Sequence, residues 1–434
     1  MINKEKFFRS VLCSVVGDAY GYPYEKIGNN VGSSVVREEL FFDWDKTVGG
    51  RFYGHSESHK AGSYSDDTQM ILMNLRSLFF PNYEEEYLKK VELHKWSSYA
   101  RGAGRAVMKA SKAVLEHSAI PKKDFLNAGG NGTAMRMIPI ILKYLDGDLN
   151  YLIQKVYKNA LVTHGHPRAL LGASLQAYVC YLIYKYDFND FKDLFANIVR
   201  DIDIWSQIPN NYQDIDLEEW DKCSNNIIFK LTRILQGYES LSMNECIELL
   251  GAKGDLKGAC DICVITSIYL YSKFHNDIIN GIRYIGSKEG VDTDTLACIL
   301  GGFLGLHSKD DSWITDEVKQ VQDYNYLINL VDRIYTPNNT ENLEDYIGKD
   351  GYIKDKLSIK TKLKDSFECE DSVFGIVRVT NIEVNKTKQD NLYNIRKTCY
   401  TQEGQTLYIN ENYKKDELIN LLSLLKSKNL IDKA

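Results

Sequence analysis

The chain has 434 residues, of which 44% are hydrophobic and 26% are charged, and its formal net charge is -6. This is ordinary globular usage, and it excludes a disordered chain, a collagen and a simple coiled coil. The mild acidic excess gives no overall electrostatic reason to bind nucleic acid, although it leaves room for a local basic patch.

The first 16 residues combine lysines with apolar residues, as a signal peptide does. Arg9 interrupts the apolar stretch, however, and Gly17-Asp18 stands where a small-residue cleavage site would be. We therefore expect a helix of the core. The longest apolar run, residues 296–306, is about half of a bilayer-spanning length. We expect no transmembrane helix and no membrane partner.

From residue 4 to about residue 335, apolar residues recur mostly at helical spacing. The segments that show this most clearly are 84–96, 103–117, 151–163, 169–186, 225–238 and 259–271. Strand-like alternation is scarce, although residues 41–53 could hold a short irregular strand. The pattern predicts a large, mainly α domain over residues 1–335.

The character of the chain changes after residue 335. Residues 336–340 (TPNNT) are typical of a linker. Strands are predicted over residues 372–383, 391–400 and 405–409, and a closing amphipathic helix over residues 414–428. We expect residues 341–434 to form a small α+β appendage that could be removed without unfolding the main domain. Such an appendage could also bind an unknown protein partner.

The nine cysteines are an odd number, and several lie inside apolar runs. This usage suits buried free thiols in a reducing cytosol, so we expect a cytoplasmic protein. Cys260 and Cys263 form one CxxC motif. A zinc site would need a second pair or histidines nearby in sequence, and neither is present. We interpret the motif as part of a buried helix.

Two acidic segments share one design. Ser65-Asp66-Asp67-Thr68 and Asp292-Thr293-Asp294-Thr295 each lead straight into an apolar stretch. N-capping would account for one such residue in each helix. A helix that is apolar all round is buried, and clustered carboxylates near the interior persist as anions only beside a positive charge. We therefore favour a site for hard cations, Mg²⁺, Mn²⁺ or Ca²⁺, and two could share it.

Three further segments carry candidate site residues. Residues 17–25 (GDAYGYPYE) place Glu25 in an aromatic-flanked loop, where it could act as a general acid or base or be a solvated loop glutamate. Residues 127–135 form a Gly/Asn loop whose amides could approach a phosphate. His164, in Thr163-His164-Gly165-His166, fits a position near a ligand or in a structural hydrogen bond better than a metal site.

Taken together, these segments resemble the ADP-ribosylglycohydrolase family, which includes dinitrogenase-reductase-activating glycohydrolases and ADP-ribosyl-acceptor hydrolases. The matching segments, in family order, are GDAYGYPYE at 17–25, SDDTQM at 65–70, RGAG at 101–104, GNGTAMRMIPI at 130–140, THGHPRALLGA at 163–173 and GVDTDTLACILGG at 290–302. Each motif alone is weak, but six in order are a specific signal. The resemblance spans about residues 10–307 and does not extend past about residue 340.

The resemblance implies a compact all-α fold with a binuclear Mg²⁺ centre, in which Mn²⁺ could replace Mg²⁺. The metal ligands that it implies are Ser65, Asp66, Asp67, Asp292, Asp294 and Thr295. The family usually has threonine where Ser65 stands, and serine keeps the ligating hydroxyl. Val291 stands where a glycine is common, which could perturb the turn before Asp292.

The resemblance also implies residues that contact the substrate. Gly130, Asn131, Gly132 and Met135 match the loop that wraps the diphosphate and the distal ribose, and His164 matches a position in the ADP-ribose cleft. Asp18 matches an acid of the first motif, where substrate is bound. Glu25, or a carboxylate of the metal shell such as Asp67 or Asp292, would act as the catalytic acid or base.

The expected function is Mg²⁺-dependent hydrolysis that removes ADP-ribose from a modified acceptor, most simply an ADP-ribosylated protein side chain. One alternative is a catalytically silent protein of the same fold that binds ADP-ribose or has a regulatory role. Another is a hydrolase acting on ADP-ribosylated nucleic acid or on small metabolites; the lack of a basic excess disfavours nucleic acid. The acceptor linkage is not encoded in any of these motifs.

Overall fold

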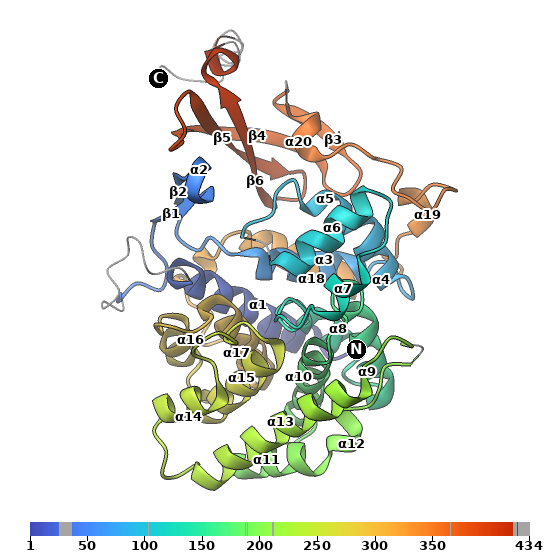
Figure 1. The fold of residues 1–434 in the computed structure, drawn as a ribbon, viewed down its shortest axis with the longest axis vertical. Coiled ribbons are helices and arrows are strands. Elements are labelled where there is room, and N and C mark those ends of the chain that lie inside the picture. The colour runs from blue at the N-terminus through green and yellow to red at the C-terminus, as the bar shows by residue number, and fades with distance from the viewer. Residues whose placement is uncertain are drawn as a thin grey trace.

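The computed structural model describes residues 1–25, 37–102, 104–186, 188, 190–210, 212–364, 366–419 and 423. Helices form most of the molecule, and a four-stranded antiparallel sheet lies at one end of its long axis (Figure 1). This arrangement confirms the predicted fold class, a mainly α domain with a small C-terminal α+β appendage.

Two buried helices, α1 (Lys4–Gly21) and α17 (Thr293–His307), pack against each other at the centre. Their backbones approach closely because glycines stand at the contact. A Cβ atom added at Gly301 would lie 2.2 Å from the carbonyl oxygen of Cys13, and one at Gly21 would lie 2.4 Å from that of Thr293. The contact at Gly21 sets the start of α17 against the end of α1.

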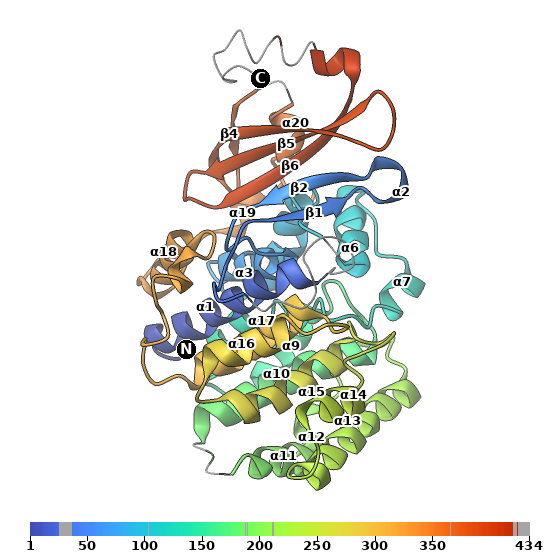
Figure 2. The ribbon, with the colours of Figure 1, turned by 90° about the vertical axis from the view of Figure 1, so that its left-hand side faces the viewer.

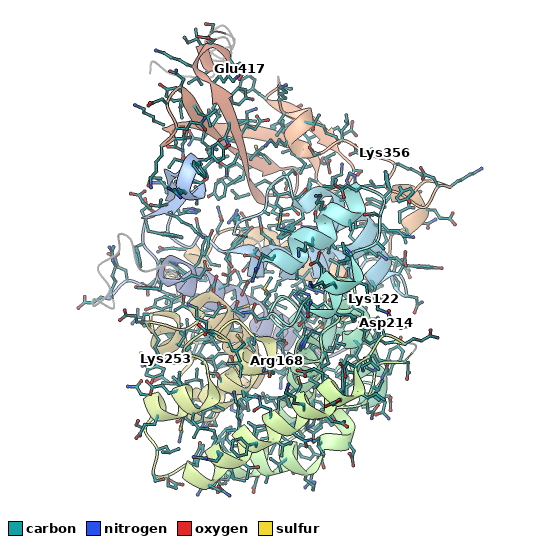
Figure 3. All side chains as sticks on the ribbon, viewed as in Figure 1. Lys122, Arg168, Asp214, Lys253, Lys356 and Glu417 are labelled. Atoms are coloured by element: carbon teal, nitrogen blue, oxygen red, sulfur yellow. The ribbon has the colours of Figure 1, made fainter. Side chains whose placement is uncertain are left out.

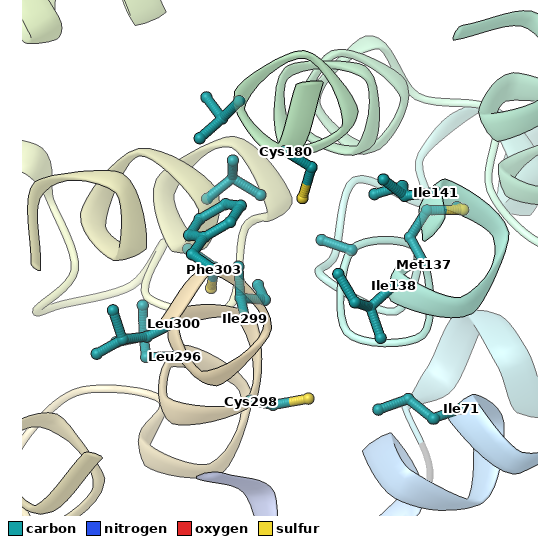
Figure 4. Close-up of a cluster of buried hydrophobic side chains, with 14 of the residues drawn as sticks. Ile71, Met137, Ile138, Ile141, Cys180, Leu296, Cys298, Ile299, Leu300 and Phe303 are labelled. Atoms are coloured by element: carbon teal, nitrogen blue, oxygen red, sulfur yellow. The ribbon is translucent and has the colours of Figure 1, made fainter. Parts of the chain in front are cut away.

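Four more helices enclose this pair: α3 (Asp66–Ser77), α8 (Ile138–Tyr144), α10 (Pro167–Lys185) and α15 (Cys260–Phe274). Figure 4 shows Cys298 of α17 and Ile71 of α3 pointing toward one another, with Ile138 of α8 beside them. All three side chains are buried. The core therefore fixes the starts of α3 and α17 relative to each other.

The remaining helices of the larger part lie around this centre. They are η1 (Tyr22–Tyr24), α4 (Glu84–Tyr87), η2 (Leu88–Glu92), α5 (Leu93–Trp96), α6 (Arg105–Leu115), α7 (Lys122–Leu126), α9 (Leu149–Ala160), α11 (Phe191–Arg200), α12 (Ile202–Trp205), α13 (Leu217–Gly237), α14 (Met243–Leu250), α16 (Ile278–Gly286), η3 (Val318–Gln320) and α18 (Tyr324–Tyr335). All six helical segments predicted from periodicity are confirmed. The segment 84–96 contains a π-helical turn, η2, and the segment 225–238 lies within the longer α13.

A β-hairpin interrupts the helical part. Strands β1 (Trp44–Val48) and β2 (His55–His59) pair antiparallel and are joined by the short helix α2 (Gly50–Tyr53). The strand expected within residues 41–53 is therefore real but short, and its partner β2 was not predicted. In Figure 2 the hairpin lies between the helices and the C-terminal sheet.

The C-terminal sheet has the order β3-β4-β5-β6, with every pair antiparallel. Its strands are β3 (Glu368–Asp371), β4 (Gly375–Lys386), β5 (Leu392–Thr401) and β6 (Thr406–Lys414), and two short helices, α19 (Leu343–Tyr346) and α20 (Ile359–Lys362), precede it. The three predicted strands are confirmed, and β3 was missed. Of the predicted closing helix, residues 415–419 are helical, while most of the rest falls outside the described residues.

The sheet and the helical part share one buried interface. Phe374 and Leu407 belong to the same apolar cluster as Trp96 and Met73. Arg76 donates to Glu92 at 2.5 Å and to Gln405 at 2.8 Å. These contacts argue against the expectation that the appendage could be removed harmlessly, whereas the division at residues 335 and 341 stays a prediction.

All nine cysteines are free, and all except Cys369 are buried, which confirms the expectation of free thiols. Within the described ranges, no helix combines the length and the apolar character that crossing a membrane requires.

Candidate active site

The N-termini of α3 and α17 open onto one cavity of about 450 Å³. Its lining includes Asp66 and Asp67 from α3, and Asp292, Asp294 and Thr295 from the start of α17. The two acidic segments, more than 200 residues apart in the sequence, therefore meet at one cavity. Five of the six predicted metal ligands line this cavity.

Asp18 and Ser65 lie beneath the cavity and do not line it. The fully buried Asp18 carboxylate accepts hydrogen bonds from the backbone amides of Ser65 (3.2 Å) and Thr68 (2.9 Å) and from the Thr68 hydroxyl (2.5 Å). Burial raises the pKa of Asp18. Ser65 is the N-cap of α3, and its hydroxyl accepts from the amide of Asp67. In this structure Asp18 thus anchors the start of α3, while its substrate-binding role stays a prediction.

The carboxylates in the cavity destabilise one another as anions. Burial, followed by Glu25 and Asp18, raises the pKa of Asp66 to about 7. Burial, followed by Asp18, Asp66 and Asp292, raises the pKa of Asp67 well above its usual value. For Asp294, burial is again the largest cause of a strongly raised pKa, followed by Glu25. A positive charge bound here would relieve this repulsion.

Two observations bear on whether a cation fits these acids. Asp67 Oδ2 is buried and has no hydrogen-bond partner among the described residues. The donors are carboxylate and hydroxyl oxygens, the type that Mg²⁺ prefers. Across the described ranges, however, no group of three or more His, Cys, Asp or Glu side chains is arranged to hold a metal ion. The donor set fits a hard cation in its chemistry, while the side chains as they stand form no finished coordination shell.

The Gly/Asn loop forms the opposite wall of the cavity. Gly130, Asn131, Gly132 and Met135 all line it, while their role in binding the diphosphate and ribose stays a prediction. The loop is held in place because the Asn131 amide donates to the carbonyl of Gly258 at 3.0 Å. The Asn131 side chain donates to Asp292 Oδ2 at 3.1 Å, which joins this wall to the acidic wall.

His164 lies at the base of the loop and also lines the cavity. Its Nδ1 is 2.7 Å from the hydroxyl of Thr163, and a Cβ atom added at Gly132 would lie 2.9 Å from its ring. Burial, and then Arg136, lowers the pKa of His164 to about 3. A neutral ring in this place supports the loop, and it leaves His164 unsuited to proton transfer near neutral pH.

Glu25 follows η1 and lines the cavity with a side chain that is 28% exposed. Its Oε2 lies 3.7 Å from Nζ of Lys46 on β1. Glu25 is therefore partly accessible and close to the acids, as an acid or base at this cavity would need to be.

The cavity mouth contains charged residues that sequence reasoning missed. Arg105 and Lys109 project from one face of α6, and Lys109 forms an ion pair of 2.6 Å with Asp124 of α7. A second pair, Lys122 and Asp214 at 2.6 Å, ties α7 to the segment before α13 (Figure 3). The four-residue spacing of Arg105 and Lys109, directly after the RGAG segment, was a signal that could have identified them.

Comparison with known proteins shows to which family the chain belongs. The sequence model described as ADP-ribosylglycohydrolase matches residues 2–343. The chain belongs to the ADP-ribosylglycohydrolase family. The match covers both acidic segments and the Gly/Asn loop, and it ends before the C-terminal sheet.

Similarity to solved structures agrees with the ADP-ribosylglycohydrolase fold. A structure described as an ADP-ribosylglycohydrolase-related protein complex has a TM-score of 0.52 and 17% sequence identity to this chain. The alignment covers 76% of this chain and 97% of that chain. At this identity the likeness shows the fold alone. A comparison with curated proteins found no match.

Proposed function

We propose that this ADP-ribosylglycohydrolase family member is a Mg²⁺-dependent hydrolase that removes ADP-ribose from a modified protein side chain. The observation that carries the proposal is one cavity in which the acids of two helix starts face the Gly/Asn loop. Family membership points to hydrolysis of a glycosidic bond. The cation, the substrate and the acceptor are the parts that we propose.

The cation would be held by oxygen donors at the two helix starts: Ser65, Asp66, Asp67, Asp292, Asp294 and Thr295. Support comes from the unpaired Asp67 Oδ2 and from the raised pKa values of the neighbouring carboxylates. Bound Mg²⁺, or Mn²⁺ in its place, would supply charge neutralisation, orientation of ribose hydroxyls and a more acidic water.

Proton transfer falls to the chain's own carboxylates. Glu25 reaches the cavity from outside the acidic cluster, so it can take a proton from the attacking water or give one to the leaving acceptor. Asp67 and Asp292, which line the same cavity, are the alternatives for this role. The remaining negative charge stabilises the cation-like sugar centre that forms during glycosyl transfer.

The loop wall would bind the rest of ADP-ribose. The backbone of Gly130, Asn131 and Gly132 would approach a diphosphate, and the two glycines add no side chain to obstruct it. Arg105 adds positive charge to the cavity lining, where a diphosphate would be attracted, whereas the charge of Lys109 is balanced by Asp124. Met135, also in the lining, would provide an apolar contact for the substrate.

A catalytically silent protein of the same fold is the second candidate. It would bind ADP-ribose in the same cavity, and so it differs from the enzyme in turnover alone. All four acids and the hydroxyls of Ser65 and Thr295 are present, which favours an active enzyme.

The test is release of ADP-ribose from arginine-linked and serine-linked ADP-ribosylated proteins, each measured with Mg²⁺ and with EDTA. The proposal expects release with Mg²⁺ alone, and the substrate that responds identifies the linkage. If ADP-ribose binds in calorimetry but neither substrate is cleaved, the silent protein or another acceptor replaces it. Equal release with EDTA would contradict the role of the metal.

A further inference from the structure

A second cavity, also about 450 Å³, lies between the β1–β2 hairpin, the turn at Arg101-Gly102 and strands β5 and β6 of the C-terminal sheet. We call it the basic pocket, defined by Lys46, His59, Arg101, Arg396, Glu57 and Tyr408. Three of these residues, Lys46, Arg101 and Arg396, are basic, and Glu57 is acidic. The family match ends at residue 343, so Arg396 and Tyr408 come from outside it.

The cations of the basic pocket are buried with unused hydrogen-bond donors. Arg396 is 1% exposed, Arg101 5% and Lys46 7%. Among the described residues, no hydrogen-bond partner is found for Arg396 Nε and Nη2, Arg101 Nε or Lys46 Nζ. Burying charged donors without hydrogen-bond acceptors is unfavourable, so an anion that accepts from these atoms would complete the arrangement.

Packing alone accounts for only part of this arrangement. Arg101 donates to the carbonyls of Tyr64 (3.1 Å) and Thr406 (2.9 Å), and Arg396 donates to the carbonyl of Ser58. Both guanidinium groups lie over the Tyr408 ring, 4.4 Å and 3.9 Å from its centroid. These contacts hold the two guanidinium groups in place. Arg101 Nε and Arg396 Nε and Nη2 have no hydrogen-bond partner among the described residues.

Three acids lie near the basic pocket, and among the described residues none of them is within hydrogen-bond distance of Lys46, Arg101 or Arg396. Glu57 lies 3.3 Å from His55, and Glu25 and Glu383 each lie 3.7 Å from their cation, Lys46 and Arg396 respectively. The pKa of the buried His59 reflects the positive charge around it. Burial, followed by Arg396, Arg101 and Lys46, lowers its pKa well below the usual value.

Gly102 separates the basic pocket from the candidate active site and lines both cavities. Its φ is +89°, and a Cβ atom there would lie 3.5 Å from Lys46 Nζ and 3.8 Å from Asp66 Oδ1. A single small group at this position would therefore touch both the basic pocket and a candidate metal ligand. The far end of a substrate bound in the candidate active site could therefore reach the basic pocket.

We propose that the basic pocket binds an oxyanion, such as a phosphate or a carboxylate, that belongs to the acceptor part of the substrate. This rests on the proposed function, because ADP-ribose itself is assigned to the first cavity. Nε and Nη2 of Arg396, with Arg101 Nε and Lys46 Nζ, are the donors that match the oxygens of such an anion. The pocket would thereby select acceptors that carry negative charge next to the modified atom.

The first test is calorimetric titration of inorganic phosphate into the full chain already saturated with ADP-ribose, at constant ionic strength. Phosphate is expected to bind to this complex. Binding should weaken about tenfold or more in Arg396→Gln, because a hydrogen-bonded charge pair is lost. Lys60→Gln is the matched control, since Lys60 is an exposed cation of the same hairpin that pairs with Asp43; it should bind phosphate as the unchanged protein does.

Arg396 is deeply buried, so Lys46→Gln is the second variant, and melting temperature checks the folding of each. Unchanged phosphate binding in both folded variants would overturn the proposal, as would phosphate that binds only in competition with ADP-ribose. If ADP-ribose itself fails to bind, the proposed function fails, whereas phosphate binding that depends on Arg396 would still show the basic pocket.

The second test assigns the anion to the acceptor. ADP-ribosylated peptides with a phosphoserine beside the modified residue are compared with the same peptides carrying serine. The proposal expects a lower KM for the phosphorylated peptide, lost in Arg396→Gln, and inhibition of its hydrolysis by inorganic phosphate. Equal KM values for the two peptides, with phosphate still bound, would make the pocket a site for free phosphate and contradict the acceptor assignment.

Discussion

At the scale of single residues, Glu25 is the side chain at which the catalytic rate and the affinity for ADP-ribose can best be tested separately. It lines the cavity from η1, outside both acidic helix starts. Replacing Glu25 by Gln keeps the size of the side chain and removes its capacity to exchange a proton. We predict a fall in kcat of about 10²–10⁴-fold, with ADP-ribose affinity retained. Single-turnover kinetics and calorimetry measure the two quantities; an unchanged kcat would make Glu25 a bystander.

The raised pKa values of the cavity acids predict a dependence of stability on pH. Aspartates in the unfolded chain titrate near pH 4, whereas the pKa of Asp66 in the fold is raised to about 7. The folded state therefore holds this proton more tightly. Stability is lost as the pH rises from about 4 through about 7, and beyond that for Asp67 and Asp294.

A divalent cation should reverse this loss. Added Mg²⁺ should raise the melting temperature more at about pH 8 than at about pH 5, because the carboxylates that bind it carry more charge there. At a hundredfold excess over Kd, binding to the folded state alone stabilises it by about 2.7 kcal/mol. Thermal unfolding at matched ionic strength measures the shift, and an equal or absent shift at both pH values would count against a metal site.

Several site residues could be predicted from the sequence, and others could not. Asp66 and Asp294 could be found because each stands where an apolar helix begins. Gly130 and Asn131 could be found because their loop repeats small and amide residues. Arg396 could not, because a single arginine in an alternating strand carries no sign that tertiary packing will bury it against Ser58, 338 residues earlier.

At the scale of elements, the contact of α1 with α17 places the acidic segment of α17. Gly301→Ala should destabilise the protein by about 1–3 kcal/mol, because the new methyl group would meet the backbone of Cys13 at 2.2 Å. This loss would occur although alanine favours helix over glycine by about 1 kcal/mol. Gly104→Ala is the control, since nothing described lies within 4 Å of its added Cβ. Denaturant unfolding compares the two variants, and equal stabilities would contradict the close packing.

Helices were easier to predict than strands in this chain, for physical reasons. Long segments such as α10 carry several turns of apolar periodicity, so their existence is clear even where their ends shift by a few residues. β2 has the sequence HSESH, whose inward residues are histidine and glutamate, so no apolar alternation marks it. β3 has four residues, too few to show a period.

At the scale of the whole molecule, the C-terminal sheet completes the core of the helical part. Lys95 is fully buried and lies 2.9 Å from both Asp355 and Asp371. A chain that ends at residue 340 would leave this ammonium group without its two carboxylates and would remove Phe374 and Leu407 from the Trp96 cluster. Loss of one partner from a buried ion pair alone destabilises by about 3–5 kcal/mol.

The truncated chain should therefore express poorly or melt at a much lower temperature than the full chain. A chain that ends at residue 419 is the control, because it keeps the four strands. Soluble yield and thermal unfolding measure the difference. A chain of 340 residues that melts with the full-length protein would restore the view of the sheet as a separable module.

The sequence motifs predicted a helical domain and a small appendage. They did not indicate that residues of both parts line one cavity. The lining of this cavity includes Arg101, which belongs to a family motif, and Arg396, which does not. Contacts between such distant segments depend on the folded arrangement, so only the structure reveals the basic pocket beside the candidate active site.

The central claim is that the acids of α3 and α17 act together on ADP-ribose. Its most direct test is the rate of ADP-ribose release, in Mg²⁺, by the unchanged protein and by Asp294→Asn. Asp203→Asn, an exposed position on α12, is the control. We predict that Asp294→Asn lowers the rate by about a hundredfold or more, while Asp203→Asn does not alter it. Release by Asp294→Asn at the rate of the unchanged protein would contradict the account.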